Sequence, residues 1–218
     1  MKASLATRMA MVICIAVALG LYSCKKGNSS AQSVNSNENV STAGDDQAQV
    51  SDESDAITND VSTALESGAD FSGANNSAVS LSGTTAVNGV ATEPLGHGRW
   101  SVPGLICDAT VTYDTSNAQR IITIVYDGVN CRGNRTRTGT VVITLPLGKH
   151  WKDAGATATI TIQQLKITRM PDQKTIIIDG SKTFTNVSGG LLVNLSSLGS
   201  ITHAVKSDGI TITFNNGK

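Results

Sequence analysis

The sequence predicts an all-β fold for its second half, an antiparallel meander, sandwich or partly open barrel, preceded by a disordered linker with one short helix. Three observations support this prediction. Beyond residue 97, apolar and polar residues alternate with a period of two, threonine and β-branched aliphatics dominate, and turn signals recur about every ten to fifteen residues. We therefore divide the chain into residues 1–23, 24–96 and 97–218.

The N-terminus has the features of an export signal. Lys2 and Arg8 form a short positive region, and residues 9–20 follow as an apolar run of twelve residues. That run is shorter than the roughly 20 residues that a transmembrane helix needs, and its length is typical of the core of a signal peptide. We interpret residues 1–23 as a signal peptide.

Leu21-Tyr22-Ser23-Cys24 follows the apolar run and resembles a bacterial lipobox. The resemblance implies that a signal peptidase cuts before Cys24 and that this cysteine is lipidated, for example with palmitate. An ordinary secretory signal and an uncleaved anchor are the alternatives. Acyl chains contribute about 0.8 kcal/mol per buried CH₂ group, and several chains together hold a protein stably at a membrane. We expect the mature chain to be anchored through Cys24 without spanning the membrane.

Charge is distributed unevenly along the chain. Residues 27–96 hold ten Asp or Glu and no Lys or Arg, whereas residues 97–218 hold thirteen Lys or Arg and seven Asp or Glu. Such asymmetry usually separates a tail from a domain. The first of these segments is also rich in Asn, Ser, Gly and Gln, which cannot bury enough apolar surface to fold. We interpret residues 24–96 as an acidic low-complexity tether.

One part of this tether has a helical pattern. Its apolar residues recur at helical spacing and precede a glycine stop signal at Gly68; they are Val50, Ile57, Val61, Ala64 and Leu65. The spacing predicts a short amphipathic helix over 46–67. It is interpreted either as a helix that docks a partner, or as a weak helix that packs loosely on the domain or frays.

The predicted strands follow one another closely after residue 97. They are 109–113, 122–126, 139–145, 156–162, 175–178, 182–186, 191–195, 200–205 and 209–214. Their outward positions are mostly Thr, Lys, Arg and Asn, so one face of the sheet should be wet and the other apolar. A domain of about 120 residues has room for one core, which must rest on Ile, Val and Leu because aromatic residues are few.

Cys107 and Cys131 are the two cysteines of the predicted domain. Cys107 precedes one predicted strand and Cys131 follows the next, so a hairpin of these strands brings the two residues together. Since exported proteins reach an oxidising compartment, we predict a disulfide between these two cysteines. It would close a loop of about 25 residues and stabilise the fold by about 3 kcal/mol. Free buried thiols and a reactive site are the alternatives.

Several motifs occur in the order found in a family of uncharacterised lipoproteins of Bacteroidota. They are Cys107-Asp-Ala-Thr-Val-Thr, Gly128-Val-Asn-Cys131, Asn134-Arg-Thr-Arg-Thr-Gly139, Asp179-Gly-Ser-Lys-Thr-Phe-Thr-Asn186 and Ser207-Asp-Gly-Ile-Thr-Ile-Thr-Phe214. Residues 105–214 resemble this family, but depart from it at Asn134, where glycine is usual, and at Thr140, where lysine is usual. The resemblance implies an exported β-rich lipoprotein with no established activity.

The residues after the lipobox bear on where such a lipoprotein faces. In that phylum, acidic residues soon after the lipidated cysteine favour display on the cell surface, and Lys25-Lys26-Gly27 lacks them. We therefore expect an outer-membrane lipoprotein that faces the periplasm rather than the cell surface.

Arg132, Arg135 and Arg137 form the densest positive cluster, and the last two share a face of an extended segment. One interpretation is capture of an anionic glycan, lipid headgroup or phosphate by the guanidinium groups. The other is pairing with carboxylates on neighbouring strands, such as Asp108 or Asp127.

Trp100 and Trp151 lie beside basic residues near predicted turns. They are interpreted either as a sugar-stacking platform or as partly buried residues of the core or its rim.

Motifs of catalysis are absent from the sequence. It has no nucleophile elbow, no phosphate-binding glycine loop, no HExxH and no glutamate beyond Glu93, and its histidines are too dispersed to suggest a zinc site. The basic cluster lacks interleaved aromatic residues, which argues against nucleic acid as a partner. We expect no catalytic residues, no metal and no cofactor.

The resulting expectation is a non-catalytic structural or binding lipoprotein of the cell envelope. Its partners would be the membrane, through the lipid anchor, and either a glycan or another envelope protein. The alternative is a surface module that binds glycans or anionic polymers through the arginines and tryptophans named above.

Overall fold

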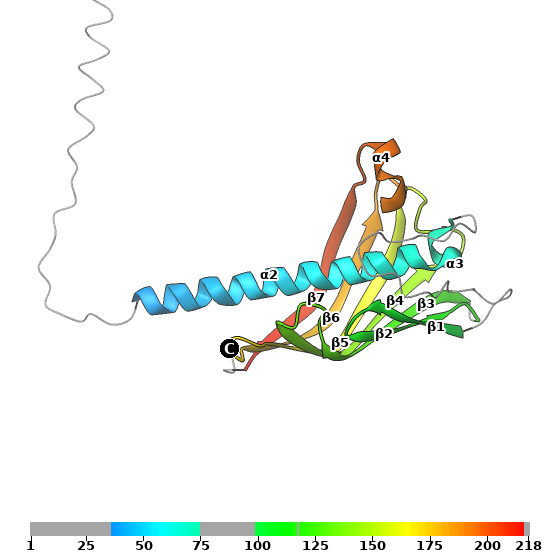
Figure 1. Cartoon of the computed structure of the whole chain (residues 1–218). Coiled ribbons are helices and arrows are strands. Elements are labelled where there is room, and N and C mark those ends of the chain that lie inside the picture. The colour runs from blue at the N-terminus through cyan, green and yellow to red at the C-terminus, as the bar shows by residue number, and fades with distance from the viewer. Residues whose placement is uncertain (1–35, 75–98, 117, 216–218) are drawn as a thin grey trace, which may run out of the picture. The chain divides into compact units, whose positions relative to one another are not determined.

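The structure is a computed structural model that describes residues 36–74, 99–116 and 118–215 (Figure 1). The chain forms two compact units, Met1–Ala48 and Gln49–Lys218. The helices are α2 (Ser36–Ser67), α3 (Ala69–Ser72), the 3-10 turn η1 (Leu192–Asn194) and α4 (Leu195–Leu198). The strands are β1 (Arg99–Ile106), β2 (Ala109–Asp114), β3 (Gln119–Val129), β4 (Arg135–Pro146), β5 (Ala156–Arg169), β6 (Thr175–Asn186) and β7 (His203–Phe214). No described helix is long and apolar enough to cross a membrane.

The seven strands form one antiparallel sheet in the order β1-β2-β3-β4-β5-β6-β7. Each strand therefore pairs with its neighbours in the sequence, as expected when short turns join the strands. The sheet stays open, with β1 and β7 at its edges. The predicted all-β class is confirmed, and of the three arrangements considered, the structure is the meander.

Alternation along the strands puts apolar side chains on one face of the sheet. In β5, for example, Ala156, Ala158 and Ile160 are buried, while Thr157 and Thr159 between them are exposed. The helix side of the sheet is therefore the apolar side, and the prediction of one wet and one apolar face is confirmed.

Several predicted strands differ from the structure, and β1 was not predicted. Segments 175–178 and 182–186 are parts of β6, because a bulge interrupts the pairing without ending the strand. For the same reason residues 203–205 and 209–214 are parts of β7, whereas residues 200–202 precede that strand. The prediction of a strand over 191–195 is wrong. The backbone turns at Gly189 and Gly190, which both have positive φ, and Leu192–Leu198 continue as η1 and α4.

The predicted helix over 46–67 lies within α2, which starts ten residues earlier at Ser36. From Gln49 onward α2 crosses the apolar face of the sheet (Figure 1). Its predicted apolar residues Ile57, Val61 and Leu65 are at most 1% exposed and belong to the same core as the strands. The interpretation of a loosely packed or frayed helix is therefore wrong for these residues.

The folded domain consequently begins earlier than predicted. Residues 49–72, which were assigned to the tether, belong to the compact unit, so its boundary is Gln49 and not residue 97. The predicted signal peptide, Cys24 and the tether residues 24–35 and 75–96 lie outside the described residues.

Gly68 ends α2 as predicted and also serves the packing of the helix on the sheet. A Cβ atom there would lie 2.9 Å from the Tyr113 ring. The hydroxyl of Tyr113 donates to the carbonyl of Ala64 at 2.9 Å, and its ring packs edge-on against Phe71. The close approach at Gly68 lets this tyrosine join α2, α3 and β2.

A row of bulges crosses the sheet from β4 to β7. Gly139 and Gly180 have positive φ at these points, and Gln164 of β5 has its backbone N–H and side-chain amide bound by Asp179 at 2.7 Å each. Bulges increase the local bend of a strand, so these three aligned ones bend the sheet in the region where α2 crosses it.

The bulge at Gly139 predicts a sharp sensitivity to substitution. At its φ of +133°, a Cβ atom would lie 2.5 Å from the carbonyl oxygen of Gln164 and 2.7 Å from the Cα of Leu165, both backbone atoms that cannot turn aside. We expect Gly139→Ala to lower the free energy of unfolding by about 2–4 kcal/mol in urea denaturation.

The matched control is Gly128→Ala on the adjacent strand, where the nearest atom to a new Cβ is 3.8 Å away. This control should change the free energy of unfolding by less than about 1 kcal/mol. Equal effects of the two substitutions would contradict the assigned role of the bulge.

Candidate functional site

The turn between β3 and β4 is organised by Asn130. Its side-chain oxygen accepts the backbone N–H of Asn134 at 3.1 Å and of Arg135 at 3.3 Å, and its side-chain nitrogen donates to Asn134 Oδ1 at 2.8 Å. Its own backbone N–H donates to the Arg135 carbonyl at 3.0 Å. Asn in such a turn satisfies backbone groups that have no strand partner, and here it fixes the start of β4.

Cys107 and Cys131 form the predicted disulfide, with Cα atoms 5.4 Å apart. As expected, β2 and β3 pair as a hairpin, in which Ala109 lies opposite Tyr126. Both cysteines are solvent-exposed. The bond joins the β3–β4 turn to the β1–β2 connection, and the residue after Cys107 is the buried Asp108.

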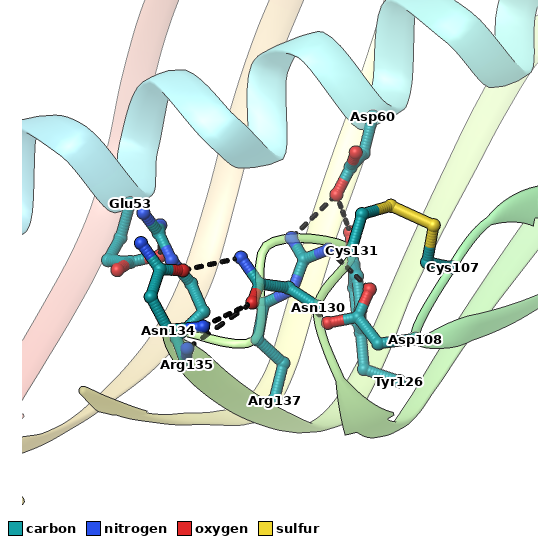
Figure 2. A network of polar contacts seen from close by, with 10 residues as sticks. All are labelled: Glu53, Asp60, Cys107, Asp108, Tyr126, Asn130, Cys131, Asn134, Arg135 and Arg137. Carbon is teal, nitrogen blue, oxygen red and sulfur yellow. Dashed lines mark hydrogen bonds and ion pairs between the residues drawn. A yellow bond between two sulfur atoms is a disulfide. The ribbon is translucent and has the colours of Figure 1, made fainter. Parts of the chain in front are cut away.

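Arg137 is the centre of a buried charge cluster (Figure 2). Its guanidinium donates to both carboxylate oxygens of Asp108 at 2.6 Å and to Asp60 of α2 at 2.6 Å. The Tyr126 hydroxyl donates to the same Asp60 oxygen at 2.9 Å, and the guanidinium carbon lies 4.3 Å from the centre of the Tyr126 ring. Arg137 thus binds a strand connection, a neighbouring strand and the helix at once.

Three further cations of the sheet meet the helical segment. Arg135 forms an ion pair with Glu53 at 2.6 Å, and Lys182 of β6 donates to the Thr58 hydroxyl at 3.0 Å. Arg120 of β3 donates to the backbone carbonyls of Asp70, Pro146 and Lys149. The side chains of Arg120, Arg137 and Lys182 are almost fully buried, as is that of Glu53.

Burial and charge shift the titration of this cluster in opposite directions. Burial alone would lower the pKa of Arg137, but its hydrogen bonds to Asp108 and the charge of Asp60 raise that pKa above its ordinary value. Burial raises the pKa of Glu53 and outweighs the opposing charge of Arg135. Burial also lowers the pKa of Lys182 and, with the nearby charge of Asp60, raises the pKa of Tyr126 well above its ordinary value.

This arrangement is suited to holding the helix on the sheet. Asp60 and Asp108 bind the same guanidinium, so neither carboxylate is available as an acid or a base toward a substrate. Tyr126 keeps its proton because its pKa is raised. In the part of the chain that the structure describes, no three His, Cys, Asp or Glu side chains gather as metal ligands.

The three predicted arginines have different environments in the structure. Arg135 and Arg137 pair with carboxylates, which favours the structural interpretation of the cluster; Asp108 is a partner as predicted, whereas Asp127 is exposed. Arg132 is exposed in the turn and has no ion-pair partner among the described residues.

Trp151 cannot contribute to the proposed sugar-stacking platform. Trp151 is completely buried against Phe184, with ring centres 4.8 Å apart, and His203. It is therefore a core residue, as the alternative interpretation held. Trp100 lies in β1, outside the residues whose side chains are described.

The residues that sequence reasoning missed are the acidic partners on α2, Glu53 and Asp60. A signal for them was present, because an acidic segment without any Lys or Arg precedes a domain with a net charge of about +6. That asymmetry was interpreted as a tail next to a domain. For Glu53 and Asp60, the structure shows that it is charge complementarity within one fold.

Replacement of Arg137 tests the charge cluster. Arg137→Met keeps much of the side-chain volume but leaves Asp108 and Asp60 without their counter-charge, so we expect the free energy of unfolding to fall by about 3–5 kcal/mol. Arg132→Met in the exposed turn is the matched control and should change it by about 0.5 kcal/mol or less. Urea denaturation measures both, and a similar loss for the two variants would refute the role assigned to Arg137.

Glu66 gives the fold a predictable pH dependence. Burial raises the pKa of this α2 carboxyl above its ordinary value of 4.5, although its Oε2 accepts the backbone N–H of Leu192 at 3.0 Å. A raised folded-state pKa means that the protonated form is favoured by folding. Its contribution to stability is complete below the ordinary pKa and is lost as the pH rises through the raised value.

We therefore expect Glu66→Gln to reduce the fall in the free energy of unfolding between about pH 5 and about pH 8. The control Ser51→Ala changes an exposed residue of the same helix that does not titrate, and it should keep the slope of the wild type. Denaturation curves across this pH range measure the slopes, and a slope for Glu66→Gln as steep as that of the wild type would count against the prediction.

Comparisons with known proteins give no match: no family model, no curated protein and no solved structure is similar to this chain. The resemblance of residues 105–214 to Bacteroidota lipoproteins accordingly stays an expectation drawn from motifs.

Proposed function

We propose that this chain is a lipid-anchored lipoprotein of the outer membrane that faces the periplasm and whose β-domain has a structural or binding role without catalysis. The observation that carries the non-catalytic role is the charge cluster around Arg137. The described residues that would be the strongest candidates for acid–base or anion-binding chemistry are instead bound to one another.

Two further features support the proposal. The signal sequence and Cys24 provide the anchor, and the exposed Cys107–Cys131 disulfide is the kind of bond that persists in an oxidising, exported compartment. The fold adds a domain whose core includes Ile57, Val61 and Leu65 of α2.

The alternative, a surface module for glycans or anionic polymers, loses most of its predicted contacts. Arg135 and Arg137 are held by carboxylates and Trp151 is buried. Arg132 alone among the arginines of the cluster keeps an exposed side chain without an ion pair in the described part of the chain. We therefore do not assign anion binding to this cluster.

Metabolic labelling with an alkyne analogue of palmitate tests the anchor. We expect label on the wild type and none on Cys24→Ser, whereas Cys14→Ser, which changes a cysteine within the apolar run, should keep the label. Label that persists on Cys24→Ser, or none on the wild type, would refute lipidation at Cys24.

Protease treatment of cells that make the wild-type protein tests where the domain faces. We expect the domain to resist protease on intact cells and to be digested once the outer membrane is permeabilised. Digestion on intact cells would instead place the domain on the cell surface and return glycan binding to consideration.

A further inference from the structure

The connection between β6 and β7 presents an unusual surface. Residues 187–202 contain no charged side chain. Five of the eleven exposed large hydrophobic residues in the described part of the chain lie here, each 41–57% exposed. We call these five the apolar tip; they are Val187, Leu192, Val193, Leu195 and Leu198. In Figure 1 this connection, with α4, projects beyond the ends of β6 and β7.

The base of this connection is fixed. Asn186 donates from its side chain to the carbonyls of Trp151 at 2.7 Å and Gly190 at 2.8 Å, and the backbone N–H of Gly190 donates to the Lys152 carbonyl at 2.7 Å. Gly189 packs so closely on this neighbouring connection that a Cβ atom would lie 2.8 Å from the backbone nitrogen of Ala154. The fold therefore holds the apolar tip outward on an ordered base.

The β4–β5 connection borders the apolar tip and adds to the same end of the sheet. It contributes Leu147, which is 61% exposed, and the exposed Lys149 and Lys152. The half-exposed carboxylate of Asp153 faces back toward His150, whose backbone N–H it accepts at 2.7 Å. This end of the domain thus combines aliphatic side chains with two lysine cations at the border.

The composition of this surface favours lipid over protein as its partner. Residues 187–202 contain no Trp, Tyr or Arg, the residue types that dominate the binding energy of protein interfaces. Transfer of aliphatic side chains into a bilayer is favourable without a surface of complementary shape. Lysines at the border of the apolar tip are in addition attracted to anionic lipid headgroups.

We propose that the apolar tip inserts shallowly into the bilayer surface to which the chain is anchored. This inference rests on the proposed anchor at Cys24. Gln49, where the compact unit begins, follows Cys24 by twenty-five positions, and the last thirteen of these lie in α2, so the anchor keeps that unit within about 60 Å of the lipid. At that range even a weak contact is made repeatedly, because the tether raises the effective concentration of the membrane.

The test uses the full-length gene product purified from membranes and reconstituted in vesicles of phosphatidylethanolamine and phosphatidylglycerol. A polarity-sensitive fluorophore is attached to Ser197→Cys in α4 or, as the control, to Ser207→Cys on the exposed middle of β7. We expect the emission at position 197 to shift to the blue and to be quenched by spin-labelled lipids, with neither effect at position 207.

Substitutions in the labelled protein make the test specific. Val193→Asn and Leu195→Asn should each reduce the inserted fraction roughly fivefold to tenfold, because each removes an exposed aliphatic side chain. Val129→Asn, which changes a similarly exposed valine at the opposite end of the sheet, should leave it unchanged.

Two results would overturn the proposal. In the first, the fluorophore at position 197 stays in water and escapes the lipid quencher. In the second, its blue shift depends on protein density and disappears on dilution without any lipid quenching, which would assign the apolar tip to contact between copies of the chain. Palmitate labelling of the same preparation reports separately whether the anchor is present, so failure of the anchor and failure of the insertion are distinguished.

Discussion

The ion pairs between α2 and the sheet are the constraint on which this fold depends. An open sheet with one apolar face must cover that face, and α2 supplies the cover from Gln49 onward. The helix must also pair the buried charges of the sheet, since removing one partner of a buried ion pair is strongly destabilising. Glu53 and Asp60 lie two turns apart on one side of the helix and meet Arg135 and Arg137 of β4. Sliding the helix by one turn would leave Glu53, Asp60 and Arg135 without these partners and Arg137 with Asp108 alone, so the pairs set the position of the helix on the sheet.

The β3–β4 turn and the disulfide prepare this contact. Asn130 closes the turn and fixes where β4 begins, which places Arg135 and Arg137 on the helix side. The Cys107–Cys131 bond fixes the neighbouring connection, so that Asp108 meets Arg137 through two hydrogen bonds of 2.6 Å. The polar turn, for which ligand binding was one interpretation of the sequence, thus positions the arginines that hold the helix.

Much of the fold was predictable because it depends on local patterns. Alternation identified most strands, helical spacing found the packed part of α2, and hairpin pairing brought the two cysteines together. The partners of the arginines were not predictable, since Glu53 and Arg135 are 82 residues apart and nothing local links them. Residues 191–195 were mistaken for a strand because their aliphatic residues fit one. The two positive-φ glycines before them start a turn. In this turn the backbone N–H of Leu192 donates to Glu66, which is distant in the sequence.

The charged residues of the domain and its exposed aliphatic residues lie in different places. The charges around Arg137 are paired with one another. The uncharged connection 187–202 instead exposes aliphatic groups that no described residue covers. Glu66 meets Leu192 at the base of that connection, and Gln49 lies about 25 Å away along the helix. The helix that covers the apolar face therefore also contacts the base of the apolar tip, so one element links the buried ion pairs to the exposed aliphatic surface.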